Sequence, residues 1–95
     1  MLIIELTYKK PLAELDSVLQ EHRSFLQRYY DKGILVASGP QIPRTGGIII
    51  ALTDETTMRT ILKEDPFYQL DLADYRFIIF DPIKYCDALK PLLTT

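Results

Sequence analysis

The chain has 95 residues, of which 47% are hydrophobic and 25% charged, so we expect a single globular domain over residues 1–95. Its formal net charge of −2 argues against a nucleic-acid-binding protein, because such proteins usually present a basic patch. No apolar run approaches the roughly 18 residues of a membrane span, and the first residues lack the features of a signal peptide. The single cysteine, Cys86, suits a reducing compartment. We therefore expect a cytoplasmic protein that binds neither nucleic acid nor membranes.

The first half of the chain predicts a strand, a long helix and a second strand. Residues 2–8 (LIIELTY) place alternate apolar side chains on one face, which is the pattern of a strand. A helix should then run from about residue 11 or 12 to residue 30, with Gly33 as its stop signal. Residues 34–38 (ILVAS) predict the second strand.

The second half predicts two more strands and two short helices. In chain order these elements are a surface loop at 41–47 (QIPRTGG), a strand at 48–52 (IIIAL), a helix capped by Thr53 or Asp54 with Met58, Ile61 and Leu62 on its buried side, a helical turn with Asp65 as N-cap and Pro66 in first position, and a strand at 75–80 (YRFIIF). The tail can form one or two helical turns before Pro91.

This β-α-β-β-α-β order is the pattern of a ferredoxin-like α+β domain, with two helices on one face of a four-stranded antiparallel sheet. The strands at 34–38, 48–52 and 75–80 are apolar on both faces, as in a sheet that is covered on both sides. A chain of this size has no further element to cover the second face. We therefore predict a homodimer that packs sheet to sheet.

His22, the chain's only histidine, falls in the middle of the apolar stripe of the long helix, between Leu19 and Leu26. A lone histidine at such a position is most often a core residue that is hydrogen-bonded to a backbone carbonyl. The alternative is a site residue, because an imidazole ring is suited to proton transfer near neutral pH. The residues alone leave both interpretations open.

The segment EHRSFLQRYYDKGILVASGP, followed by a glycine-containing loop, an apolar strand and EDPF, resembles the YciI-like proteins. These look like relatives of the muconolactone-isomerase group of dimeric α+β barrel proteins. The resemblance runs from the first strand to the closing IIFDP segment and is specific for the fold rather than for a reaction. It implies a pocket near a dimer interface, with His22 and Asp65 side by side as the catalytic pair.

The sequence departs from the family pattern directly after the histidine. Several family members have a bulky apolar residue at that position, whereas this chain has Arg23 and Ser24. The changed charge near His22 either alters the substrate preference or lies outside the pocket.

Other candidate residues have structural explanations as well. Asp65 is a good helix N-cap whatever the function, and one carboxylate oxygen can cap while the other meets the imidazole. We predict a substrate-binding role for Ser38, Gly39, Pro40, Arg44 and Phe67. Gly46–Gly47 lacks the lysine of a phosphate loop, and no partner histidine accompanies Cys86 as a catalytic thiol. One histidine and scattered carboxylates give no metal-ligand spacing, so we expect neither a metal nor a cofactor.

Two functional classes follow. The first is a small cofactor-independent lyase or isomerase, in which His22 acts as general base or acid and Asp65 orients its ring. Its substrate would be a small lactone, enol or carboxylate, whose anionic group Arg23 or Arg44 could hold. The second class is a non-catalytic dimeric module that binds a small metabolite or a partner. A solvent-connected cavity at His22 would favour the first class.

Overall fold

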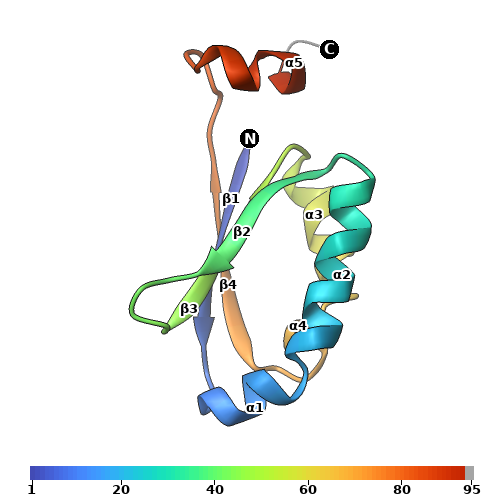
Figure 1. The fold of residues 1–95 in the computed structure, drawn as a ribbon, viewed down its shortest axis with the longest axis vertical. Helices are drawn as coiled ribbons and strands as arrows, with labels where there is room; N and C mark the ends of the chain where they lie inside the picture. Colours follow the sequence, from blue (N-terminus) through green and yellow to red (C-terminus); the bar gives the residue numbers. More distant parts are fainter. Residues whose placement is uncertain (94–95) are drawn as a thin grey trace.

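The strands of the computed structural model form one antiparallel sheet whose inner face is covered by helices (Figure 1). The structure describes residues 1–93. Its elements are β1 (Leu2–Tyr8), α1 (Leu12–Ser17), α2 (Leu19–Asp31), β2 (Leu35–Pro40), β3 (Gly46–Ala51), α3 (Glu55–Leu62), α4 (Pro66–Gln69), β4 (Ala73–Ile79), the 3-10 helix η1 (Asp87–Leu89) and α5 (Lys90–Leu93). The strand order is β2-β3-β1-β4. The predicted ferredoxin-like α+β arrangement is confirmed.

The inner face of the sheet supplies half of the hydrophobic core. Leu2, Ile4 and Leu6 of β1 alternate toward the helices and are at most 2% exposed, as the period of two in the sequence predicts. They face the predicted buried side of α3, where Asp54 caps the helix by accepting a hydrogen bond from the Thr57 backbone N–H. Burial of these apolar side chains fixes the register of β1 between β3 and β4.

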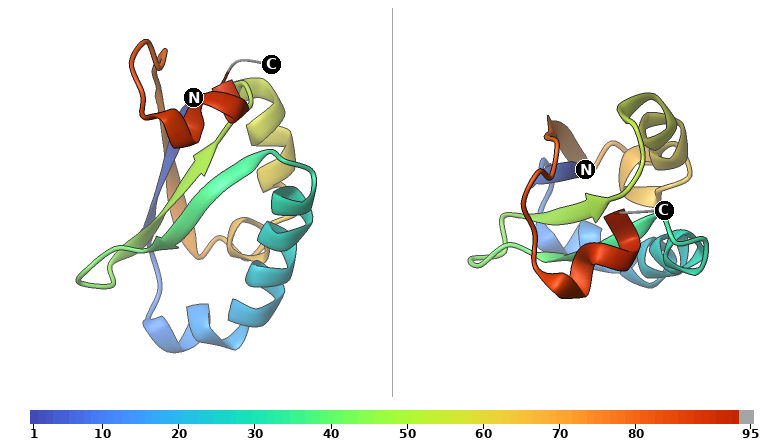
Figure 2. Two further views of the ribbon diagram at one scale, coloured as in Figure 1. Left: turned by 45° about the horizontal axis from the view of Figure 1, so that its top comes forward. Right: turned by 90° about the horizontal axis from the view of Figure 1, so that it is seen from above.

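The outer face of the sheet carries isoleucines in neighbouring positions. Ile3 on β1 is paired with Ile50 on β3 and with Ile78 on β4. Two residues further along β1, Glu5 lies between Ile48 and Arg76, and its carboxylate forms an ion pair with the Arg76 guanidinium at 3.3 Å. No helix among residues 1–93 packs on this face (Figures 1 and 2). The predicted strands at 48–52 and 75–80 thus carry apolar side chains on the outer face at Ile50 and Ile78, and the ion pair of Glu5 with Arg76 makes this face polar beside them.

The predicted helix over residues 11–30 is instead two helices, α1 and α2, which meet at an angle (Figure 1). Val18 separates them with φ −123° and ψ 17°, outside the helical region. Two local features favour this break. The Ser17 hydroxyl donates to the Glu14 backbone carbonyl at 2.6 Å and so competes for a carbonyl of the last turn of α1. The β-branched Val18 has a low helix propensity. The stop at Gly33 is as predicted, because its φ of +73° suits a residue without a Cβ atom.

The strand boundaries differ from the predicted ones by a few residues. Gly46 and Gly47 belong to β3 rather than to the loop, and β2 continues through Pro40. Gly46 lies so close to β1 that a Cβ atom on it would be 1.7 Å from the Leu6 carbonyl oxygen. This pair of glycines therefore serves close strand packing, and the predicted loop shortens to residues 41–45.

The tail continues past the end of β4, and η1 and α5 lie beyond the end of the sheet near the N-terminus of the chain (Figure 1). The expected helical turns are present, but α5 includes Pro91 instead of ending before it. Pro91 is the second residue of α5, where the backbone N–H needs no partner within the helix. Among residues 1–93, no helix is both long and apolar enough to cross a membrane.

Candidate active site

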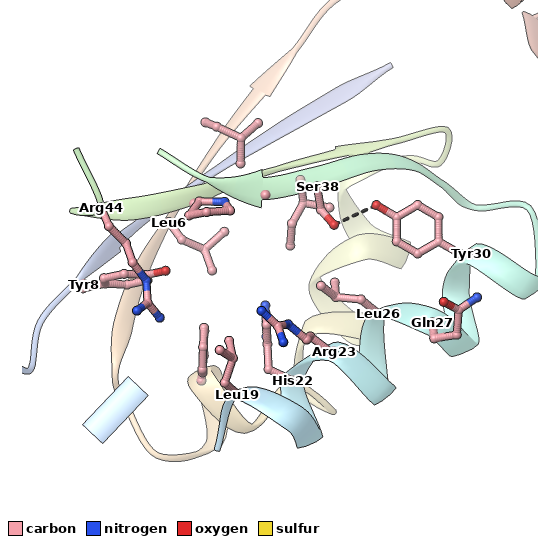
Figure 3. Close-up of a pocket in the computed structure, with 16 residues that line it drawn as sticks. Leu6, Tyr8, Leu19, His22, Arg23, Leu26, Gln27, Tyr30, Ser38 and Arg44 are labelled. Carbon is pink, nitrogen blue, oxygen red and sulfur yellow. Dashed lines mark hydrogen bonds between the residues drawn. The ribbon is translucent and has the colours of Figure 1, made fainter. Parts of the chain in front are cut away.

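A cavity of about 670 Å³ lies between α2 and the sheet and is partly open to solvent (Figure 3). This volume is in the range of small-molecule sites. The residues around it come from β1, α2, β2, β3, α4 and the loop at 41–45. They are Leu6, Tyr8, Leu19, His22, Arg23, Leu26, Gln27, Tyr30, Ser38, Gly39, Pro40, Arg44, Gly47, Ile48, Ile49 and Phe67.

His22 and Asp65 are in direct contact at the inner end of this cavity. The Nδ1 atom of His22 lies 2.8 Å from Oδ1 of Asp65. Both residues are buried, with His22 8% and Asp65 0% exposed. An ionised carboxylate can only accept hydrogen bonds, so Nδ1 carries the proton and donates it to Asp65. In the neutral ring, the lone pair is then on Nε2.

Three donors hold the buried carboxylate of Asp65. Oδ1 accepts from the Phe67 backbone N–H at 3.0 Å as well as from His22, and Oδ2 accepts from the Tyr75 hydroxyl at 2.8 Å. The predicted division of labour between the oxygens is therefore wrong, since one oxygen both caps α4 and meets the imidazole. Burial, together with the nearby charge of Asp65, raises the pKa of Tyr75, which keeps this hydroxyl protonated as a donor.

The His22 ring has one covered face and one open edge. The Phe67 ring stacks on it with centroids 3.9 Å apart and planes at 5°. In the described part of the chain, each side-chain nitrogen or oxygen that is buried from solvent has a hydrogen-bond partner. Nε2 of His22 makes no hydrogen bond there, so this atom must be accessible to solvent. The ring points from α2 toward the cavity (Figure 3).

Two arginines supply positive charge at the wall. Arg44 donates to Oδ1 of Asp16 at 2.7 Å, and its guanidinium lies 5.9 Å from the centre of the Tyr8 ring. The hydrogen bond to Asp16 raises the pKa of Arg44, with a smaller contribution from Tyr8. Arg23 follows His22 on α2 and also lines the cavity.

The residues that the sequence singled out lie together. His22, the predicted binding residues Ser38, Gly39, Pro40, Arg44 and Phe67 all line the cavity, and Asp65 lies behind His22. Ser38 is not free, because its hydroxyl lies 2.7 Å from that of Tyr30 (Figure 3). Among residues 1–93, no three His, Cys, Asp or Glu side chains are grouped as metal ligands.

Sequence reasoning missed Tyr75 and most of the apolar wall. Tyr75 pairs with Leu6 across β4 and β1 and so faces inward, but its contact with Asp65 depends on the strand register. Tyr8 carried a usable signal, because it is the last inward-facing residue of the first strand. The wall residues Leu6, Leu19 and Ile49 read as ordinary core positions.

The sequence model described as YCII-related domain matches residues 1–81. The chain belongs to the YCII-related family. The resemblance seen in the sequence is thereby confirmed, and the tail from residue 82 onward lies outside the match. No curated protein matches the sequence.

Among solved structures, this YCII-related protein is similar to 5-chloro-2-hydroxyhydroquinone dehydrochlorinase (TftG) from Burkholderia phenoliruptrix AC1100, in complex with 2,5-dihydroxybenzoquinone. The TM-score is 0.70, and the match covers 85% of this chain and 94% of that chain. The sequences are 17% identical, so the likeness shows a common fold.

Proposed function

We propose that this YCII-related protein is a small, cofactor-independent enzyme of the lyase or isomerase type. His22 moves a proton on a small lactone, enol or carboxylate that binds in the cavity. One observation carries the proposal: Nδ1 of His22 is fixed by the buried Asp65, while Nε2 is unpartnered at the edge of an open cavity. A histidine with a purely structural role in the core would be enclosed by other side chains rather than line a cavity.

In the proposed reaction, Nε2 of His22 accepts a proton from a carbon or hydroxyl of the substrate. The ring becomes an imidazolium, and the carboxylate of Asp65 stabilises its charge through the bond to Nδ1. The electron pair left on the substrate either shifts a double bond, with the proton returned at another atom, or expels a leaving group. Because Phe67 covers one face of the ring, the substrate approaches the edge that carries Nε2.

The structural neighbour supports this class of reaction. A dehydrochlorinase removes hydrogen chloride, which couples proton loss to the departure of a leaving group, and its structure contains a ring-shaped quinone. In the proposal, the cavity of this protein binds a flat ring as well, because apolar walls suit such a ligand. The residues proposed to contact the ring are Ser38, Gly39, Pro40, Arg44 and Phe67.

The proposal includes a homodimer that packs through the outer face of the sheet. Ile3, Ile50 and Ile78 are neighbours there, and Ile78 is 37% exposed. Burying several hundred Å² of such surface at roughly 25 cal/mol per Å² stabilises an association before the cost of losing free motion.

The test compares the wild-type protein with His22→Asn. The asparagine amide can still donate to Asp65 but has no nitrogen in the place of Nε2. Chloride release from 5-chloro-2-hydroxyhydroquinone and double-bond shifts in unsaturated lactones report activity. We expect wild-type turnover of at least one compound and a loss of about a hundredfold or more in the variant.

Thermal unfolding of both proteins serves as the control for folding. If the wild type turns over none of these compounds, and His22→Asn binds 2,5-dihydroxybenzoquinone as tightly as the wild type does, the proposal is wrong. Weaker binding by the variant without any wild-type turnover would favour the non-catalytic binding module.

A further inference from the structure

The charge on the cavity wall has one sign. None of the 13 acidic residues, all of which lie within the described residues 1–93, lines the cavity, although the chain as a whole has a net charge of −2. The permanently charged side chains on the wall are Arg23 and Arg44. The Asp65 charge lies behind His22, where three hydrogen bonds occupy its oxygens. The wall therefore favours a negatively charged ligand.

The two arginines differ in whether the guanidinium already has an acidic partner within the protein. Arg44 forms an ion pair with Asp16 at 2.7 Å and packs on the Tyr8 ring. A ligand anion at Arg44 would compete with the Asp16 carboxylate. Arg23 makes no hydrogen bond and no ion pair with any residue of the described chain. Its five N–H donors are therefore available to a ligand.

We propose that Arg23 is the specificity-determining residue of this site and binds a carboxylate on the substrate. The proposal rests on the cavity at His22 as the substrate site. Arg23 is next to His22 on α2 and shares the cavity with it. A guanidinium binds a carboxylate through two parallel hydrogen bonds, which fixes both the position and the orientation of the ligand.

The remainder of the wall defines the rest of the ligand. Leucine and isoleucine side chains from α2 and the sheet, together with the rings of Tyr8 and Phe67, form apolar surfaces. A site of this kind suits a small unsaturated ring with one carboxylate, bound with the carboxylate at Arg23 and a ring atom near Nε2 of His22. A neutral ring of the same shape would leave the guanidinium without a partner.

The experiment measures the binding of two matched probes, 2,5-dihydroxybenzoate and its methyl ester, by isothermal titration calorimetry. We expect the wild type to prefer the carboxylate, and Arg23→Gln to lose at least about tenfold of that preference, which is the range for a hydrogen bond to a charged group. Arg23→Lys should retain part of it, because the charge remains but the two-pronged geometry does not.

Arg28→Gln is the matched control. Arg28 is on the same helix, has the same charge and does not line the cavity, and its side chain is 54% exposed beside Glu64. Its substitution should leave the preference for the carboxylate intact. Equal affinities of the wild type for acid and ester, no measurable binding of the acid, or an unchanged preference in Arg23→Gln would each overturn the assignment. If the preference depends on Arg23 but no substrate is turned over, this assignment stands and the catalytic proposal fails.

Discussion

The Tyr75 hydroxyl donates to Oδ2 of Asp65 at 2.8 Å and so holds the one carboxylate oxygen that the histidine does not use. Asp65 thus joins three elements, because it caps α4, receives the ring of His22 from α2 and binds Tyr75 from β4. The fully buried Asp65 therefore has a structural role, and in the proposed function it also orients the ring of His22. The orientation of His22 consequently depends on the packing of the fold.

Asp65→Asn separates the charge of the carboxylate from its capping function. Asparagine is an equally good N-cap, so α4 should persist. Because one Asp65 oxygen accepts from both the Phe67 N–H and Nδ1 of His22, the asparagine oxygen that keeps the cap should also keep Nδ1–H, with the amide N–H donating to the Tyr75 hydroxyl. The variant should therefore retain the ring tautomer but lose the negative charge that stabilises an imidazolium, and turnover should fall. Nitrogen NMR shifts of the imidazole and steady-state rates measure the two effects separately. Asp81→Asn, at an exposed position, is the control. Wild-type turnover in Asp65→Asn would contradict the proposed role of the Asp65 charge.

Tyr75→Phe removes one donor from a fully buried carboxylate. Since Oδ2 of Asp65 would be left without a partner, the free energy of unfolding should fall by about 1–3 kcal/mol. Urea denaturation measures this loss. Tyr68→Phe is the matched control, because Tyr68 packs on Tyr75 but is 48% exposed and should be nearly neutral. Equal losses in the two variants would mean that the hydroxyl of Tyr75 does not support Asp65.

The local part of this site was predictable from the sequence. Asp65 before Pro66 predicts an N-cap from two adjacent residues, and His22 on an apolar stripe predicts an inward-facing ring. The contact between them spans 43 positions, and only the family resemblance indicated it. The role of Tyr75 was not predictable, because it depends on the register of β4 against β1 rather than on any nearby residue.

The fold, too, was predictable where the sequence signals are local, and the prediction failed where a single residue or a distant contact decides the structure. Alternation and capping signals are local, and they placed β1, α3 and α4 correctly. The break at Val18 involves a single residue between two helical segments, which a periodic pattern cannot resolve. The pairing of Arg44 with Asp16 joins the 41–45 loop to α1, so the sequence alone left Arg44 as an unpaired charge.

Two adjacent glycines should respond differently to alanine. A Cβ atom on Gly46 would lie 1.7 Å from the Leu6 carbonyl oxygen, so Gly46→Ala requires β1 and β3 to separate. We expect a large fall in the melting temperature or an insoluble protein. A Cβ atom on Gly47 would meet only the Gly39 carbonyl oxygen at 3.3 Å and would lie at the cavity wall. Gly47→Ala should fold and should weaken ligand binding. Equal melting temperatures of the two variants would contradict the observed approach of the strands.

The dimer prediction concerns the outer face of the sheet. Ile78 is on the edge strand β4 and is paired with Ile3, so Ile78→Lys places a charge within the apolar surface without entering the core. Light scattering should give twice the mass of one chain for the wild type and the mass of one chain for the variant. Because Ile78 is already 37% exposed in one chain, the variant should keep its far-ultraviolet circular dichroism.

Ile83→Lys makes the same substitution in the tail, at a side chain that is 81% exposed and lies outside the sheet. If the sheet face is the interface, Ile83→Lys should remain dimeric, since burial of the isoleucines of β1, β3 and β4 drives the association. If the tail carries the contact, the two results should be exchanged. A wild-type protein that is a stable monomer at micromolar concentration would show that the apolar outer face does not drive self-association.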